Sequence, residues 1–105
     1  MISATTIRQD LKEIRHYFSH RDLFDEVSSE IGTNSIMEKV KKYNRLICKA
    51  PPKLYELYVM LYVRNYTQES GAEAMNLSCN YIQKLNTDLI KFFQKEYSKE
   101  VQDNG

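Results

Sequence analysis

Apolar residues recur at steps of three and four along almost the whole chain, and no other feature constrains its fold as strongly. Such steps place side chains on one face of an α-helix. The first stripe of this kind consists of Ile7, Leu11, Ile14 and Phe18. The β-forming residues at 55–63 also keep helical steps, so the sequence has no strand pattern of useful length. We therefore expect an all-α fold with five or six helices.

Interruptions in this spacing mark the ends of the predicted helices. Pro51 and Pro52 end one helix, because each ring removes a backbone N–H and disfavours helical geometry in the residue before it. Ser35 and Glu38 fit a capping box, and Gly32 suits a left-handed helix end. The predicted helices span about residues 4–19, 23–31, 36–49, 52–64 and 68–75, followed by a longer helix that begins after Ser78.

Composition excludes several classes of protein. The 15 Lys+Arg against 14 Asp+Glu give a formal charge of +1, so net charge alone would not hold nucleic acid. No apolar run approaches the ~20 residues that a bilayer span needs, and the first eleven residues lack the apolar core of a signal peptide. Cys48 and Cys79 make no spaced framework, which is typical of reduced thiols. We expect a cytoplasmic protein with no membrane partner.

Residues 67–86 carry the most functional information. They predict a short helix, a turn of about three residues and a longer helix, which is the arrangement of a DNA-reading helix-turn-helix. Two such helices cross closely, which requires a small residue at the crossing, and Ala72 stands there. Asn76 can adopt the left-handed geometry that the turn needs. The apolar residues that would pack this unit are Met75, Leu77, Ile82 and Leu85.

The outward side chains at the start of the longer helix would face the major groove of DNA. Asn and Gln can pair bidentately with adenine edges, whereas Lys84 can reach a guanine or a phosphate. Thr67 and Gln68 open the shorter helix and could hold the DNA backbone. The predicted DNA-binding residues are Thr67, Gln68, Ser78, Cys79, Asn80, Gln83, Lys84 and Thr87.

Two features of this segment fit the motif less well. Gly71 stands where an apolar residue usually packs inward, and Gly in a helix costs about 1 kcal/mol relative to Ala. Acidic residues also offset the local lysines, so a lone copy should bind weakly, because phosphate contacts dominate affinity. The charges in question are Glu69, Glu73 and Asp88 against Lys84 and Lys91. A homodimer or help from a polymerase would then be needed, and plain packing of two helices without DNA is the alternative interpretation.

We expect one domain over residues 1–105, with three parts defined by their position relative to this motif. Residues 1–50 would form helical support and a partner surface, residues 51–97 the helix-turn-helix unit, and the polar residues 98–105 a frayed tail.

The same stretch carries a family resemblance. Residues 67–85 resemble the domain of bacterial sigma factors that reads the upstream promoter element. Roughly residues 7–97 are similar to small phage regulators of the ArpU/RinA type, from phages of Gram-positive bacteria. The stretches that carry the likeness are LKEIRHYF (11–18), KYN (42–44), APPKLYELY (50–58), LYV (61–63), TQES (67–70) and YIQKLN (81–86).

This resemblance implies control of phage late genes, such as packaging and lysis operons, inside the bacterial host cell. The protein would bind double-stranded DNA near a promoter, and contact with RNA polymerase rests on analogy alone. A protein-binding modulator is the second hypothesis. It would use the Tyr-rich helix, residues 55–66, to bind another regulator or a polymerase. The eight tyrosines of the chain suit either the edge of a core or a contact with a partner.

Other constellations predict less. His16 and His20 share a helix face, but no further Cys or His is spaced to complete a metal site. Cys79 could be a redox switch at a helix N-terminus or an ordinary contact residue. A basic face on the third predicted helix could be solvated or could bind phosphate, and its residues are Lys39, Lys42, Arg45 and Lys49. No catalytic constellation is present, so we expect no enzymatic activity, no metal and no cofactor.

Overall fold

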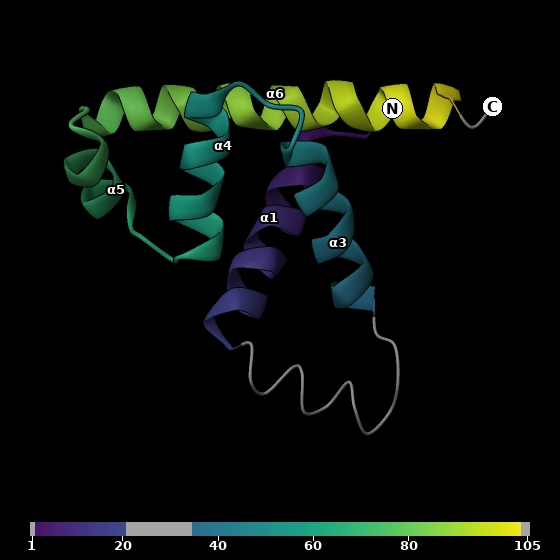
Figure 1. Cartoon of the computed structure of the whole chain (residues 1–105), viewed down its shortest axis with the longest axis horizontal. Helices are drawn as coiled ribbons and strands as arrows, with labels where there is room; N and C mark the ends of the chain where they lie inside the picture. Colours follow the sequence, from purple (N-terminus) through teal and green to yellow (C-terminus); the bar gives the residue numbers. More distant parts are fainter. Residues whose placement is uncertain (1, 21–34, 104–105) are drawn as a thin grey trace.

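The structure is a computed structural model that describes residues 2–20 and 35–103, and within these ranges it is helical with no strand (Figure 1). The predicted all-α class is confirmed. The helix predicted over residues 23–31 lies outside the described residues. The elements are α1 (Ala4–Ser19), α3 (Ser35–Ile47), α4 (Pro52–Tyr58), the π-helical segment η1 (Val59–Val63), α5 (Gln68–Met75) and α6 (Cys79–Asp103).

Local sequence signals account for several helix ends. Ser3 caps α1, where its hydroxyl oxygen accepts a hydrogen bond of 3.1 Å from the backbone N–H of Thr6. Pro52 is the first residue of α4, a position at which the missing N–H would have no partner within the helix. These two starts agree with the predicted boundaries at residues 4 and 52.

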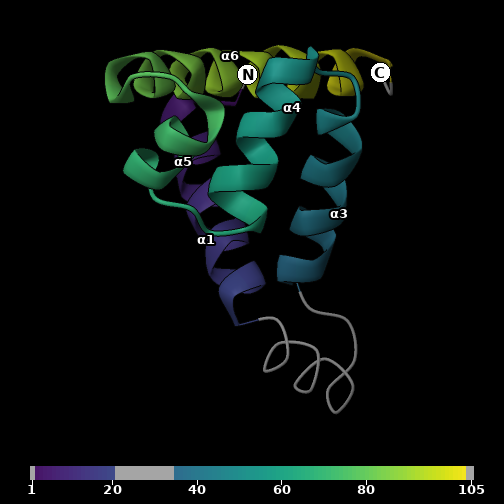
Figure 2. The ribbon, with the colours of Figure 1, turned by 60° about the vertical axis from the view of Figure 1, so that its left-hand side comes forward.

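The long helix α6 lies across one end of α1, α3 and α4, as Figures 1 and 2 show from two sides. Its inward stripe closes the core, and its residues are Ile82, Leu85, Leu89 and Phe93, each at most 6% exposed. One continuous cluster of buried side chains draws on α1, α3, α4, η1, α5 and α6. Because α5 packs under the first part of α6, the same core positions both helices.

The fourth predicted helix contains a local change in hydrogen bonding. After Tyr58 the chain forms η1, and the N–H of Arg64 donates to the carbonyl oxygen of Val59 at 2.8 Å, five residues back. Asn65 then adopts a left-handed backbone with φ 60°. The guanidinium of Arg15 on α1 donates to Asn65 Oδ1 at 3.3 Å, which ties this turn to the first helix.

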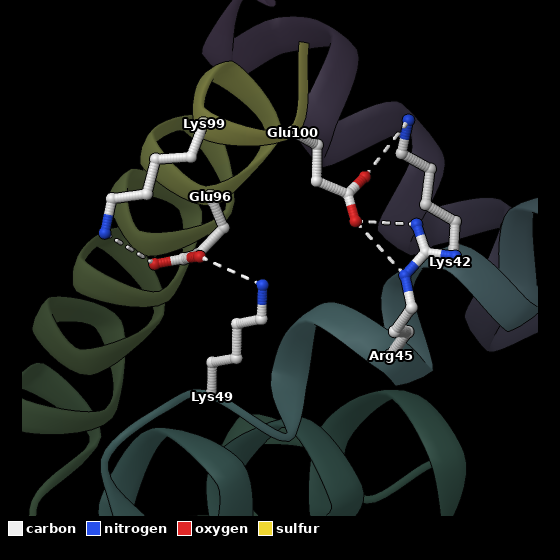
Figure 3. Close-up of polar contacts among 6 residues, drawn as sticks. All are labelled: Lys42, Arg45, Lys49, Glu96, Lys99 and Glu100. Carbon is white, nitrogen blue, oxygen red and sulfur yellow. Dashed lines mark hydrogen bonds and ion pairs between the residues drawn. The ribbon is translucent and has the colours of Figure 1, made fainter. Parts of the chain in front are cut away.

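The C-terminal residues form helix where the sequence predicts a frayed tail from residue 98. Helix α6 continues to Asp103. The reason is a contact that is distant in sequence: the carboxylate of Glu100 accepts two hydrogen bonds from Arg45, at 2.7 Å and 3.1 Å (Figure 3). One turn earlier, the carboxylate of Glu96 pairs with Lys49 at 3.9 Å and with Lys99 at 3.3 Å.

These contacts also account for the basic face predicted on the third helix. Lys42 and Arg45 both pair with Glu100 of α6, and Lys49 pairs with Glu96 (Figure 3). Lys39 faces the other way and pairs with Asp10, at 3.1 Å, and with Glu13 of α1. The face is therefore partly exposed but neutralised by carboxylates, and it holds α3 between α1 and α6.

Candidate nucleic-acid interface

The α5–α6 unit (residues 67–87) begins with a capped helix of only eight residues. The hydroxyl oxygen of Thr67 accepts a hydrogen bond of 3.0 Å from the backbone N–H of Ser70, and the hydroxyl group itself donates to Ser70 Oγ. This contact satisfies one of the N–H groups that have no partner at the start of α5. The predicted cap and the predicted span of residues 68–75 agree with the structure.

The turn between the helices follows the Schellman pattern. Asn76 has φ 57° and ψ 46°, and its N–H donates to the carbonyl oxygen of Glu73 at 3.1 Å. The N–H of Leu77 donates to the carbonyl oxygen of Ala72 at 2.8 Å. These two bonds fix the exit from α5. Ser78 then caps α6, since its Oγ accepts a hydrogen bond of 3.1 Å from the N–H of Tyr81.

Small buried residues let the two helices approach each other. Ala72 is 4% exposed and belongs to the core cluster, to which Met75 and Leu77 add partly buried side chains. Gly71 is also buried, and a Cβ at this position would lie 3.4 Å from Leu61 Cδ2. Position 71 therefore faces the core, as the motif requires, and Leu61 of η1 occupies the space into which a larger side chain at position 71 would project.

All eight residues predicted to contact DNA are exposed: Thr67, Gln68, Ser78, Cys79, Asn80, Gln83, Lys84 and Thr87. On a helix of 3.6 residues per turn, Asn80, Gln83 and Lys84 share one face, and Thr87 continues it a further turn along. The buried stripe that begins at Ile82 lies on the opposite face. The first three turns of α6 therefore present an exposed, mostly polar surface.

The side chains on this surface differ in how far they are already engaged. The hydroxyls of Thr67 and Ser78 serve as helix caps, and Thr87 Oγ1 donates to the carbonyl oxygen of Gln83 at 3.1 Å. The amide of Gln83 makes one long contact of 3.5 Å with Gln68 Oε1, which links α6 to α5 across the unit. Asn80 and Lys84 have no hydrogen bond or ion pair with a described residue, and their polar ends remain free for a ligand.

Tyr81 and Lys53 are two further surface residues that the sequence prediction missed. Tyr81 is 37% exposed, and the Nζ atoms of Lys53 and Lys84 lie 5.6 Å and 5.8 Å from its ring centroid. Lys84 and Tyr81 share the first turns of α6, whereas Lys53 belongs to α4. No local signal could have found Lys53, because 28 positions separate it from Tyr81 in the chain.

Titratable groups outside this unit serve packing. Tyr43 donates a hydrogen bond of 2.6 Å to Asp10, and burial together with this bond raises the pKa of Tyr43 above its usual value of 10.0. Burial also raises the pKa values of Tyr58 and Tyr62. The hydrogen bond from Lys39 lowers the pKa of Glu13, and the same bond raises the pKa of Lys39.

The remaining predicted constellations stay apart from the unit. The rings of His16 and His20 lie 4.4 Å apart between centroids. Over residues 2–20 and 35–103, the structure has no group of three or more His, Cys, Asp or Glu side chains that could hold a metal ion. Cys48 and Cys79 are both exposed free thiols, and Cys48 Sγ donates to the carbonyl oxygen of Asn44 at 3.3 Å.

Comparisons of the chain with protein-family models, curated proteins and solved structures found no match. Among the described helices, none is long and apolar enough to cross a bilayer. The assignment of a candidate nucleic-acid interface therefore rests on the geometry of the α5–α6 unit.

Proposed function

We propose that this protein is a sequence-specific DNA-binding transcriptional regulator, and not an enzyme, that inserts the start of α6 into the major groove. The observation that carries the proposal is the exposure of Asn80 and Gln83 on the outer face of α6, opposite its buried stripe. The turn at Asn76 fixes where α5 ends before α6 begins, and the one contact of this face with α5 is the long bond from Gln83 to Gln68. A helix presented in this way is what major-groove reading requires.

The chemistry of the exposed side chains assigns their roles. Asn80 and Gln83 offer a donor and an acceptor on one amide, which matches the N6 and N7 atoms of adenine. Lys84 offers only donors and suits guanine or phosphate. Thr67 and Gln68 lie at the start of α5, where a helix-turn-helix crosses the DNA backbone. Together with the resemblance of residues 7–97 to ArpU/RinA-type regulators, this assignment favours a regulator of phage or prophage late genes.

Selection of bound duplexes from a random-sequence pool tests the proposal. A DNA reader enriches a common site, and its affinity for that site falls steeply as the salt concentration rises. Failure to enrich any sequence, together with no salt-dependent binding, would overturn it. A palindromic enriched site would indicate a homodimer, because half-site symmetry mirrors the two-fold symmetry of the protein.

The variant Gln83→Ala tests whether α6 is the helix that reads the bases. We expect it to cost about 1–3 kcal/mol on the enriched site and to relax base choice at one position. Circular dichroism should be unchanged, since the side chain is exposed and makes one long hydrogen bond among the described residues. Gln9→Ala removes an exposed amide from α1 and is the matched control. Equal binding by the parent and both variants would show that α6 does not read bases.

The second candidate, a protein-binding modulator, draws less support from the Tyr-rich helix than its sequence indicates. Tyr58 and Tyr62 turn inward, where their hydroxyls donate to Asn44 Oδ1 and Asn86 Oδ1. Tyr55 remains 46% exposed beside a pocket of about 360 Å³ whose wall includes Phe18 and Val59. This apolar pocket favours a protein contact, and such an adaptor would show no specific shift with any duplex.

A further inference from the structure

We propose that the protein binds the DNA backbone asymmetrically: Lys53 of α4 and Lys84 of α6, whose Nζ atoms lie 5.6 Å and 5.8 Å from the Tyr81 ring centroid, bind phosphates on the flank of α6 away from α5. This inference rests on the proposed DNA-binding function and deepens it. It extends the DNA footprint beyond the α5–α6 unit to a residue of the preceding helix.

The two flanks of the reading face are defined by contacts on the page. On one side Gln83 reaches Gln68 of α5. Tyr81 lies about 160° around the helix from Gln83, at 100° per residue, and it approaches Lys53 of α4. Asn80 and Lys84 lie between these two side chains on the helix surface. The reading face is thus bordered by α5 on one flank and by the start of α4 on the other.

Charge distinguishes these flanks. Helix α5 contains Glu69 and Glu73 and no Lys or Arg, so its flank offers the DNA backbone the neutral side chains of Thr67 and Gln68 but no cation. The other flank holds two ammonium groups, each less than 6 Å from the same ring centroid and therefore no more than about 12 Å apart. Duplex DNA carries one negative charge per about 1.7 Å of its axis, so two phosphates are available to groups at this separation.

The ammonium groups at this place lack the carboxylate partners that the cations between α3 and α6 have. The lysines and the arginine between α3 and α6 have carboxylate partners in Glu96 and Glu100. Lys53 and Lys84 make no ion pair with any described carboxylate, although they approach one ring together. Both lysines are exposed, so their ammonium groups are accessible to a bound phosphate backbone.

Tyr81 is the positioning residue of this cluster. The face of an aromatic ring attracts an ammonium group by about 0.5–1 kcal/mol at an exposed site. The ring therefore limits the positions of two flexible side chains, and this lowers the entropy lost when they bind phosphate. The attraction to the ring face uses no N–H donor, so the three donors of each ammonium group remain available to phosphate oxygens.

Salt-dependent binding to a random-sequence duplex tests the inference, since phosphate contacts do not depend on sequence. Each contact contributes about 0.9 to the slope of log K against log salt, which equals a loss of about 3.5-fold between 50 and 200 mM. We expect Lys53→Gln to remove one such contribution and to weaken random and enriched duplexes by the same factor. Lys41→Gln, an exposed lysine of α3 without a described ion pair, is the matched control and should keep the parent slope.

Variants of Tyr81 separate positioning from charge. Tyr81→Phe keeps the ring and should bind like the parent, whereas Tyr81→Ala should weaken both duplexes without a change in base preference. Circular dichroism confirms that each variant is folded.

Three results would overturn the inference. If Lys53→Gln and Lys41→Gln bind equally while Gln83→Ala still loses specificity, the backbone contact is wrong and the proposed function stands. If Tyr81→Ala binds like Tyr81→Phe, the ring has no positioning role. If the parent binds no duplex at any salt concentration, the inference and the proposed function fail together.

Discussion

Gly71 is a buried helical residue that gives the chain neither side-chain packing nor helix propensity. A Cβ built there lies 3.4 Å from Leu61 Cδ2, at the near limit of ordinary van der Waals contact. Its backbone is α-helical, so alanine meets no conformational penalty at this position. The position therefore tolerates one methyl group and little more.

We expect Gly71→Ala to raise the free energy of unfolding by up to about 1 kcal/mol, the difference in helix propensity between the two residues. Urea denaturation followed by circular dichroism measures the change. Gly71→Val would require Leu61 to move and should destabilise the protein. A lower stability for the alanine variant would mean that Leu61 cannot give way even by a few tenths of an ångström.

Residue-scale predictions from the sequence succeed where helical periodicity decides exposure. The five candidate DNA-binding residues on α6 are exposed because they avoid the inward stripe that starts at Ile82. The same reasoning could not find Lys53 at the Tyr81 ring, since that proximity depends on how α4 packs on α6. It also could not find that Asp10 accepts a hydrogen bond from the hydroxyl of Tyr43, a contact between α1 and α3.

Helix α5 depends on its cap more than the longer helices do. A helix of eight residues is too short to be stable by itself in water, and its first turn contains N–H groups without partners inside the helix. The Oγ1 atom of Thr67 accepts a hydrogen bond from one of those groups, the N–H of Ser70. The orientation of α5 under α6 thus rests on one hydroxyl as well as on Ala72.

Thr67→Ala should lower the free energy of unfolding by about 1 kcal/mol, within the range of 0.5–2 kcal/mol for loss of an N-cap. Thermal denaturation measures the loss, and Thr67→Asn, which can also cap, should restore most of it. Thr5→Ala changes an exposed threonine inside α1 and serves as the control. If Thr67→Ala and Thr5→Ala have the same stability, the cap contributes nothing to α5.

Element boundaries follow the sequence closely where local chemistry sets them. The span of α5, the cap at Thr67 and the left-handed Asn76 all agree with the predicted segment. Two differences remain. The π-helical segment η1 lies within the predicted helix 52–64, where the N–H of Arg64 donates to Val59 five residues back. Helix α6 extends to Asp103 because Glu100 pairs with Arg45, a tertiary contact whose partner lies outside the local sequence window that predicts a helix.

At the scale of the whole molecule, tyrosine hydroxyls tie the helices together and make stability sensitive to alkaline pH. Tyr43 joins α3 to α1, Tyr58 joins α4 to α3, and Tyr62 joins η1 to α6. Burial raises the pKa of each above its usual value of 10.0. The folded protein therefore keeps three protons that the unfolded chain releases as the pH rises through about 10.

The free energy of unfolding should consequently fall above about pH 10, because the folded state then binds more protons than the unfolded state. Each of these tyrosines contributes a slope of at most about 1.4 kcal/mol per pH unit, so the three together contribute up to about 4. The raised pKa of Lys39 acts in the same direction.

Urea denaturation at several pH values between about 9 and 11 gives the slope. Tyr58→Phe should reduce this slope by the contribution of one tyrosine, up to about 1.4 kcal/mol per pH unit. Tyr55→Phe changes an exposed side chain and is the control. A free energy of unfolding that stays constant over this range would show that the three hydroxyls ionise as easily in the folded protein as in the unfolded chain.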